Sequence, residues 1–496
     1  MDPNRIILLC VLAYMALCVA IGLWALKRTR NTSDFFMASR NLGVLITGIA
    51  LFSSIMSGFG FVGGPGLVYR MGISSFWILV TTPIGFALAF FLVAKRIRLF
   101  AELRNSISLP DIAAARYRCP KVRGLVAVAI LCGVIAYLAT QIRAMAFVLQ
   151  EIFASNGVWG HDSVVFCVVV SCTVLVFYCV TGGIIASVYT DLFQGIVMVV
   201  VAVLIFVGAV GAIEGGMGGM MEVILKDNAE AAGPWGTLGM LGCLSWFFLF
   251  TLGVAGQPHV VTKMMMSRKV EDARITLPIT LLGYTVTALL WIGIGMLMRS
   301  VVLNGGQSEL ARADDAAAVF LQSYAHPVLA GLVFAGLFAA IMSTADGFLN
   351  IGAAAIAHDI PRALTGSAIR RELMWARIAT VVLAILAAVF ALQSPIQLIG
   401  QLGAFGWGVF ASALVPVIGL GLNWRGGSRK AALAAIVFSL AANGGLVIAQ
   451  MAGFSIPYGV SGGALALMGS TLVFVGISLT SKSDSLSPDI EEVMKL

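Results

Sequence analysis

The residues best suited to chemistry gather in one otherwise apolar stretch, residues 328–360. Its middle carries four polar side chains, Ser343, Thr344, Asp346 and Asn350. A stretch of this length crosses a bilayer, which takes about 20 residues, and polar groups at that depth are costly unless they face a partner, an ion or water. One interpretation is that the hydroxyls bond to the preceding turn while Asp346 pairs with a distant cation. The clustering favours the alternative, a functional site.

Spacing divides this stretch between two helical faces. Ala340, Ser343 and Thr344 stand at positions i, i+3 and i+4 and therefore share one face. Asp346 and Asn350 lie on a neighbouring strip, and the role of that strip stays open. Asp346 is a candidate for ion coupling.

A second segment offers oxygen ligands that could complete a cation site. The run SSIMSGFGFVGGPG, which starts at Ser53, interrupts an apolar stretch with Gly and Pro, and an unwound turn frees backbone carbonyls that can hold a small cation. The five candidate oxygens are the carbonyls of Ser53, Met56 and Ala340 and the hydroxyls of Ser343 and Thr344. Neutral oxygens suit Na⁺ better than Ca²⁺, which prefers carboxylates. We predict a sodium site, provided that the two segments touch.

Two further charged residues stand inside apolar runs. Asp191 belongs to a polar face with Ser187 and Gln194; it either couples to an ion or caps and solvates a helix end. Arg143 costs about 3 kcal/mol at membrane depth and needs a partner. That partner is either a substrate carboxylate or one of the carboxylates of Asp191 and Asp346.

Composition places these residues in a polytopic membrane protein. The 496-residue chain is 60% hydrophobic and 11% charged, against about 25% charged for soluble domains. Apolar runs predict an all-α protein with about thirteen transmembrane helices. The expected spans are 6–26, 43–68, 72–94, 124–153, 163–180, 187–213, 237–256, 275–298, 327–357, 375–393, 396–421, 430–452 and 459–479.

Loop charges predict the orientation. Alternate loops and the C-terminal tail hold 25 of the 31 Lys and Arg residues, and the loops on the other side hold five. The positive-inside rule then places the N-terminus outside and the C-terminus in the cytoplasm of a cell-membrane protein. The net charge of +8 is thus a topology signal, and we expect no nucleic-acid partner.

Two Gly- and Pro-rich interruptions, at Ser57–Gly66 and Leu252–His259, lie five spans apart. This pattern is typical of transporters built from a five-plus-five inverted repeat of the LeuT type. We expect one transporter domain, 1–496. Its repeats would cover about 43–213 and 237–421, with extra helices at 6–26, 430–452 and 459–479.

No Walker or HExxH motif is found in the sequence, and no GxGxxG motif stands between a predicted strand and a helix. We therefore expect no enzymatic activity and no cofactor other than Na⁺ as coupling ion. The expected partners are a small organic solute, sodium and the lipid bilayer, without an obligate protein partner.

Five motifs resemble the sodium:solute symporter family. In chain order they are DFFMASRNLG, MSGFGFVGGPG, VTGGIIASVYTDLFQG, GQPHVVTKMM and AAIMSTADGFLN. The resemblance implies thirteen helices and Na⁺-coupled alternating access. It also implies a sodium site at the same five residues reasoned above, with Asp191 matching the family aspartate associated with sodium coupling.

Departures from the family pattern bear on the solute. Proline-type members have an aspartate where Ile55 stands and a tryptophan where Phe59 stands, which argues against proline. We expect a symporter that couples inward Na⁺ movement to uptake of a small polar solute, a carboxylate or an amino acid. The alternatives are a proton-coupled or ion-independent carrier of the same fold and a transporter-like membrane sensor. The substrate-binding candidates are Ser57, Phe59, Tyr137, Gln141, Arg143, Phe250 and Gln401.

Overall fold

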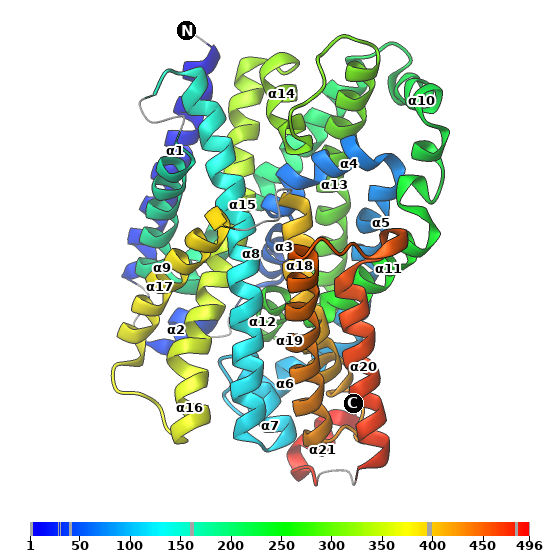
Figure 1. Ribbon diagram of the computed structural model, residues 1–496. Helices are drawn as coiled ribbons and strands as arrows, with labels where there is room; N and C mark the ends of the chain where they lie inside the picture. The colour runs from blue at the N-terminus through cyan, green and yellow to red at the C-terminus, as the bar shows by residue number, and fades with distance from the viewer. Residues whose placement is uncertain are drawn as a thin grey trace.

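The structure is a computed structural model that describes residues 3–27, 29, 31–38, 42–158, 163–393, 399–481 and 485–495. Within these residues the chain is helical, and its one strand-type pairing is an isolated bridge between Leu42 and Ser267. Most long helices run between the upper and the lower end of Figure 1, with the N-terminus at the upper end and the C-terminus near the lower end.

The helices have the following bounds. They are α1 (Pro3–Leu26), α2 (Thr32–Met37), α3 (Val44–Ile55), α4 (Gly64–Met71), α5 (Phe76–Ala89), α6 (Lys95–Leu103), α7 (Leu109–Tyr117), α8 (Pro120–Ser155), α9 (Val164–Gly211), α10 (Gly216–Asp227), α11 (Gly239–Gly253), α12 (Pro258–Met265), α13 (Ala273–Leu303), α14 (Ala316–Ser323), α15 (Pro327–Ala354), α16 (Ile360–Thr365), α17 (Glu372–Gln393), α18 (Ile399–Leu414), α19 (Arg429–Met451), α20 (Gly462–Thr480) and α21 (Pro488–Lys495).

The expected all-helical membrane architecture is confirmed, but the expected helix count is slightly wrong. In the described part of the chain, eleven helices are long and apolar enough to cross a membrane. Two shorter apolar helices, Val44–Ile55 and Val164–Phe177, stand where two further spans were expected. The backbone leaves the helix after Ile55, and Gly183 at φ +53° interrupts α9, so neither segment is a continuous long span.

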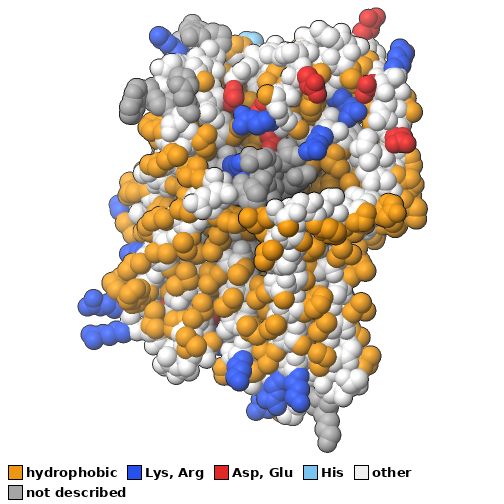
Figure 2. Space-filling view, in the orientation of Figure 1, with side chains coloured by type: hydrophobic (Ala, Val, Ile, Leu, Met, Phe, Trp, Pro, Cys, Tyr) orange, Lys and Arg blue, Asp and Glu red, His pale blue; other side chains and the backbone are white. Residues whose placement is uncertain are grey.

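Helix α15, which contains the polar stretch, lies at the centre of the molecule. It packs against α1, α8 and α9, and 83% of its most apolar window is buried. The outer surface carries a broad hydrophobic belt; on the face in Figure 2 the acidic side chains lie near the upper end together with several Lys and Arg side chains, and further Lys and Arg side chains lie towards the lower end. The polar residues of α15 are therefore shielded from lipid by other helices.

Both predicted helix interruptions are present. The first separates α3 from a π-helical turn, η2 (Phe59–Gly63), where Met56 adopts ψ 75°. The second separates α11 and the 3₁₀ turn η7 (Val254–Gly256) from α12 at Gln257, whose ψ is 111°. Gln257 precedes Pro258, and the residue before a proline is pushed into extended geometry. Local sequence thus sets where each helix breaks.

Candidate functional site

The break after α3 is held open by hydrogen bonds that replace the helical ones. The Ser57 amide donates to the Ile55 carbonyl at 2.9 Å, the Gly58 amide to Gln141 Oε1 at 2.8 Å, and the Phe59 amide to Ser57 Oγ at 3.1 Å. In a continuous helix these amides would bond to carbonyls four positions earlier. The carbonyls at the end of α3 are thereby released for other partners.

Helix α15 contacts this break, as the predicted sodium site requires. The Thr344 hydroxyl donates to the Ser54 carbonyl at 2.9 Å, and the hydroxyl oxygens of Ser53 and Ser343 lie 3.4 Å apart. The Ala340 carbonyl accepts from Thr344 at 3.2 Å within the same helix. The two segments therefore touch, while sodium coordination by Ser53, Met56, Ala340, Ser343 and Thr344 stays a prediction.

A buried lysine lies beside the predicted sodium site. Lys263 of α12 is 1% exposed, and its ammonium donates to Asp191 Oδ2 at 2.7 Å, to the Ala50 carbonyl at 3.1 Å and to the Ser54 hydroxyl. The Ser343 hydroxyl donates to the other oxygen of Asp191. A buried carboxylate and ammonium compensate each other only when both are fully hydrogen-bonded. This pair meets that condition.

Sequence reasoning counted Lys263 among the charges of a loop, which the structure shows to be wrong. The residue stands between Val260, Val261 and a run of three methionines, all without charge. That apolar setting was the available signal, because a lysine flanked on both sides by large apolar residues is unusual for a solvated loop. The missed residue supplies the cation that Asp191 needs.

The second strip of α15 contacts other helices. Asp346 Oδ1 accepts a hydrogen bond from the Ser187 hydroxyl of α9 at 2.6 Å. The Asn350 side chain donates to the Phe35 carbonyl of α2 at 3.1 Å. Asp346 therefore meets a hydroxyl, and Asn350 fastens the short helix α2 to the centre of the molecule. Ion coupling through Asp191 and Asp346 stays a prediction.

An aromatic cluster surrounds the other side of the α3 break. The Phe59 ring lies 5.7 Å from Trp291 of α13 and 6.3 Å from Phe250 of α11, and Phe250 lies 5.3 Å from Trp407 of α18. We use the name aromatic chamber for the packed group of Phe59, Phe250, Trp291, Trp407 and Gln141, all of which are buried. The indole nitrogens of both tryptophans and the Gln141 amide nitrogen are buried and have no hydrogen-bond partner among the described residues.

Polar groups from the second break lie near Tyr137. The Tyr137 hydroxyl lies 3.3 Å from Ser57 Oγ, and its ring lies 6.2 Å from the ring of His259. Both ring nitrogens of His259 and the Oε1 atom of Gln257 are buried without a partner in the described part of the structure. Ser57, Phe59, Tyr137, Gln141 and Phe250 therefore converge, as a shared substrate site would require.

Comparison with known proteins places this geometry in a family. Residues 35–438 match the model of the sodium:solute symporter family. The chain belongs to this family. It is 27% identical to a sodium/proline symporter 2 of Staphylococcus saprophyticus, over 86% of this chain and 83% of that one, and 26% identical to a sodium/proline symporter of Staphylococcus aureus, over 88% and 85%. Its function as a member of this family is Na⁺-coupled solute uptake.

Solved structures share the fold. A Na⁺-coupled sialic acid symporter in a substrate-bound outward-open state superposes with a TM-score of 0.77 at 18% identity, over 97% of this chain and 99% of the other. Mhp1, a nucleobase-cation-symport-1 family transporter, follows at 0.55 and 15%, over 94% and 99%. The expected LeuT-like fold is thus confirmed.

Asp191 and Asp346 are the two protein carboxylates considered for Arg143. Asp191 pairs with Lys263 and Asp346 with Ser187, whereas the carboxylate that acts electrostatically on Arg143 is Asp314, before α14. Asp191 thus has another cation as its partner, while the expected ion pair of Arg143 with Asp346 stays a prediction. The substrate interpretation of Arg143 stays a prediction. Residue 401 lies in α18, but the side chain of Gln401 is outside the described structure.

Proposed function

We propose that the protein takes up a small organic solute that carries acceptor oxygens, a carboxylate or an amino acid, together with Na⁺. The observation that carries this proposal is the set of buried N–H donors on Gln141, Trp291 and Trp407, which have no hydrogen-bond partner among the described residues. A buried donor without a partner costs about 1–3 kcal/mol. A solute whose oxygens accept from these donors recovers that cost on binding.

The chamber fits such a solute better than it fits a cation. The described side chains that form it are aromatic or amides, and the free groups of the two indoles are donors only. Ile55 and Phe59 also replace residues typical of proline-type members. The proposed solute is therefore an anionic or zwitterionic molecule other than proline, with Arg143 attracting its carboxylate.

We assign the sodium ion to the oxygens of Ser53, Met56, Ala340, Ser343 and Thr344. Support comes from the contact between α15 and the end of α3, and from the carbonyls that the break releases. Because Lys263 already balances the charge of Asp191, the neutral oxygens are left to the sodium ion. Binding of Na⁺ drives transport only if its affinity differs between the two conformations.

Lys263 also supports a second candidate, an ion-independent or proton-coupled carrier. The Lys263 ammonium bonds to Ser54 and Asp191, which also contact the predicted sodium ligands Ser343 and Thr344. The positive charge of the lysine therefore lies next to the position predicted for the sodium ion. In the sodium mechanism Lys263 is a fixed counter-charge. In the second mechanism it replaces the sodium ion.

Uptake by purified protein in liposomes separates these mechanisms. With Na⁺ replaced by K⁺ at fixed pH, the sodium mechanism predicts loss of accumulation, and undiminished accumulation would overturn it. Accumulation against a gradient would also rule out a pure sensor. The solute is first found by a thermal-shift screen of amino acids, monocarboxylates and sugars, because a ligand at 100 times its Kd stabilises by about 2.7 kcal/mol.

Ser343→Ala and Thr344→Ala test the sodium ligands directly. Each removes one hydroxyl, which we expect to raise the half-saturating Na⁺ concentration roughly tenfold, the equivalent of about 1.4 kcal/mol. Thr380→Ala is the matched control, since this buried hydroxyl bonds to the Ala376 carbonyl in its own helix. An unchanged Na⁺ dependence in both variants would remove these residues from the site.

We also propose that the lower end in Figure 1 is cytoplasmic. On the face in Figure 2 the acidic side chains lie near the upper end, whereas Lys and Arg side chains are seen at the lower end, and loop charges favour the basic side inside. A reporter fused after the C-terminal residue should be active in the cytoplasm, and periplasmic activity would reverse the orientation.

A further inference from the structure

A second group of titratable side chains lies at the lower end, away from the aromatic chamber. It joins α7, the start of α8, the end of α15 and the start of α17. We call Asp111, His358, Asp359, Glu372 and Arg123 the lower cluster. His358 and Asp359 belong to a π-helical turn, η9 (Ala355–Asp359), that follows α15. Asp111, His358 and Asp359 are all buried.

Three atoms of this cluster have the positions of metal ligands. One ligand atom each from Asp111, His358 and Asp359 lies within 4.8 Å of the other two. His358 Nε2 lies 2.9 Å from Asp111 Oδ2. Two neighbouring ligand atoms that each lie about 2.0–2.2 Å from one divalent ion are about 3 Å from each other, which is close to the distance between His358 Nε2 and Asp111 Oδ2. Small side-chain movements would therefore bring all three onto one ion.

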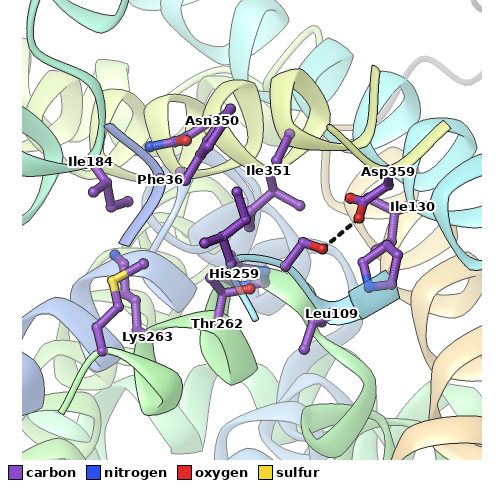
Figure 3. A pocket seen from close by; sticks show the side chains of 16 residues that line it. Phe36, Leu109, Ile130, Ile184, His259, Thr262, Lys263, Asn350, Ile351 and Asp359 are labelled. Carbon is purple, nitrogen blue, oxygen red and sulfur yellow. Dashed lines mark hydrogen bonds between the residues drawn. The ribbon is translucent and has the colours of Figure 1, made fainter. Parts of the chain in front are cut away.

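Asp359 provides the independent sign that a ligand is missing. Its Oδ1 atom accepts from the Ser108 hydroxyl at 2.6 Å (Figure 3). Its Oδ2 atom is buried and has no hydrogen-bond partner among the described residues, although the residue is only 1% exposed. A buried carboxylate oxygen without a partner is costly. A bound cation would satisfy it.

The surrounding residues supply the outer contacts that metal ligands need. His358 Nδ1 lies 2.5 Å from Glu372 Oε1, which leaves Nε2 for an ion and fixes the orientation of the ring. Asp111 Oδ1 accepts from Arg123 at 2.7 Å. A histidine that donates from one nitrogen to a carboxylate and binds metal through the other is a common arrangement in metalloproteins.

We propose that Asp111, His358 and Asp359 bind a divalent transition-metal ion that clamps α7 to the end of α15. One imidazole and two carboxylates suit Zn²⁺ or Mn²⁺. Mg²⁺ is disfavoured because it retains its water and prefers oxygen ligands. Without an ion, His358 would instead bridge Asp111 and Glu372 as an imidazolium, which is the competing explanation of the same contacts.

The position of the cluster gives the ion a consequence for transport. Ser108 and Asp359 line a cavity whose other residues include His259, Lys263 and Asn350 (Figure 3). The cavity thus lies between the lower cluster and the buried lysine beside the predicted sodium site. An ion that holds α7 against α15 would fix the lower boundary of this cavity, and we expect it to slow uptake.

The test uses purified full-length protein stripped of metal with a chelator. Calorimetric titration should show one tight site for Zn²⁺ and for Mn²⁺, and none of similar strength for Mg²⁺. His358→Gln and Asp359→Asn should weaken that site about 10- to 100-fold. His326→Gln, at the opposite end of α15, and Glu102→Gln, an exposed carboxylate of α6, should leave it unchanged.

Two further measurements keep the test decisive. His358→Cys retains a metal ligand and should bind Cd²⁺ tightly even if the glutamine variant folds poorly. In liposomes, Zn²⁺ should inhibit uptake by the wild-type protein and not by Asp359→Asn. Absence of a stoichiometric site, equal binding in the Gln and Asn variants, or uptake unaffected by bound metal would each overturn the proposal in favour of the imidazolium bridge.

Discussion

Two sides of one helix break differ in how their polar groups are satisfied. On the side of Asp191, the Lys263 ammonium has three partners, and both Asp191 oxygens accept hydrogen bonds. On the side of the aromatic chamber, the donors of Trp291 and Trp407 have no partner among the described residues. The first side is stable without a ligand, whereas the second is complete only when a ligand supplies oxygens.

The break itself links the two sides. The Ser54 carbonyl accepts from Thr344 on the ionic side, and the Gly58 amide donates to Gln141 on the chamber side. These groups lie four positions apart in one short segment. A movement that adjusts the oxygens around the predicted sodium site must therefore also move the wall of the chamber, which is the kind of coupling that a symporter needs.

The largest expected effect comes from breaking the ionic side. Lys263→Met leaves the Asp191 carboxylate buried and unpaired, which destabilises a protein by about 3–5 kcal/mol. We expect a marked fall in Tm, measured on purified protein in detergent. Adding Asp191→Asn should restore most of the loss, because the asparagine still accepts the Ser343 hydrogen bond without carrying a charge.

Lys226→Met is the control for this experiment, since that lysine lies on the surface of α10 with a 74% exposed side chain. If Lys263→Met alone were as stable as the wild-type protein, the buried pair would not be the structural element that we describe. If the double variant were stable and its uptake still needed Na⁺, Lys263 would be a counter-charge rather than a replacement for sodium.

The next effect concerns the chamber, where no loss of stability is expected. Trp291→Phe and Trp407→Phe each remove an N–H that is unpaired without solute, so the protein should be equally or slightly more stable. Solute affinity should fall roughly tenfold for each, as expected for a lost hydrogen bond of about 1–1.5 kcal/mol. The readout is the solute concentration that gives half-maximal thermal shift.

Trp424→Phe gives a matched control, because Trp424 packs against Phe474 outside the chamber. If Trp291→Phe and Trp407→Phe lowered solute affinity no more than Trp424→Phe does, the indole N–H groups of Trp291 and Trp407 would not contact the solute.

The ionic side was partly predictable from sequence, and the chamber much less so. Hydroxyls at helical spacing in an apolar run are visible as a pattern, and Gly and Pro mark the break that meets them. Which positively charged residue neutralises Asp191 depends on how α12, which follows the break at Gln257, packs against α3. The sequence offered Arg143 as a partner for Asp191, and only the packing of the helices shows that Lys263 takes this place.

The chamber tryptophans were missed for a related reason. Trp291 and Trp407 stand in apolar spans, where a tryptophan is ordinary. Their significance lies in an unpaired N–H, which is a property of their surroundings and not of residue type. Phe59 and Phe250 were found because they flank helix breaks. Sequence thus locates residues next to backbone irregularities better than residues that complete a site from regular helices.

Arg143 tests whether the chamber takes anionic solutes. Arg143→Gln removes the positive charge but keeps a polar, though shorter, side chain that can still donate a hydrogen bond. We expect uptake of carboxylates to fall about tenfold or more, with little change for a neutral solute of the same size, since charge-assisted hydrogen bonds contribute about 1.5–3 kcal/mol. Equal loss for charged and neutral solutes would assign Arg143 a structural role.

The smallest expected effect is a pH dependence set by Asp314, outside the membrane-spanning segments. Burial raises the pKa of Asp314 to about 6, despite the hydrogen bond that it accepts from the Ile399 amide and the nearby charges of Arg312 and Arg143. Its neutral form is thus favoured in the fold, so the stabilisation that it provides is present at low pH and is lost as pH rises through about 6.

This titration should also alter solute binding by Arg143. Below pH 6 the Asp314 charge disappears, and Arg143 attracts an anion with less competition. A carboxylate solute whose own pKa lies below 4 should bind about two- to fivefold more tightly at pH 5 than at pH 7.5, the equivalent of about 0.5–1 kcal/mol. Asp314→Asn should show the tighter value at both pH values, and Asp315→Asn should keep the wild-type dependence. A pH effect that survives Asp314→Asn would place the titrating group elsewhere.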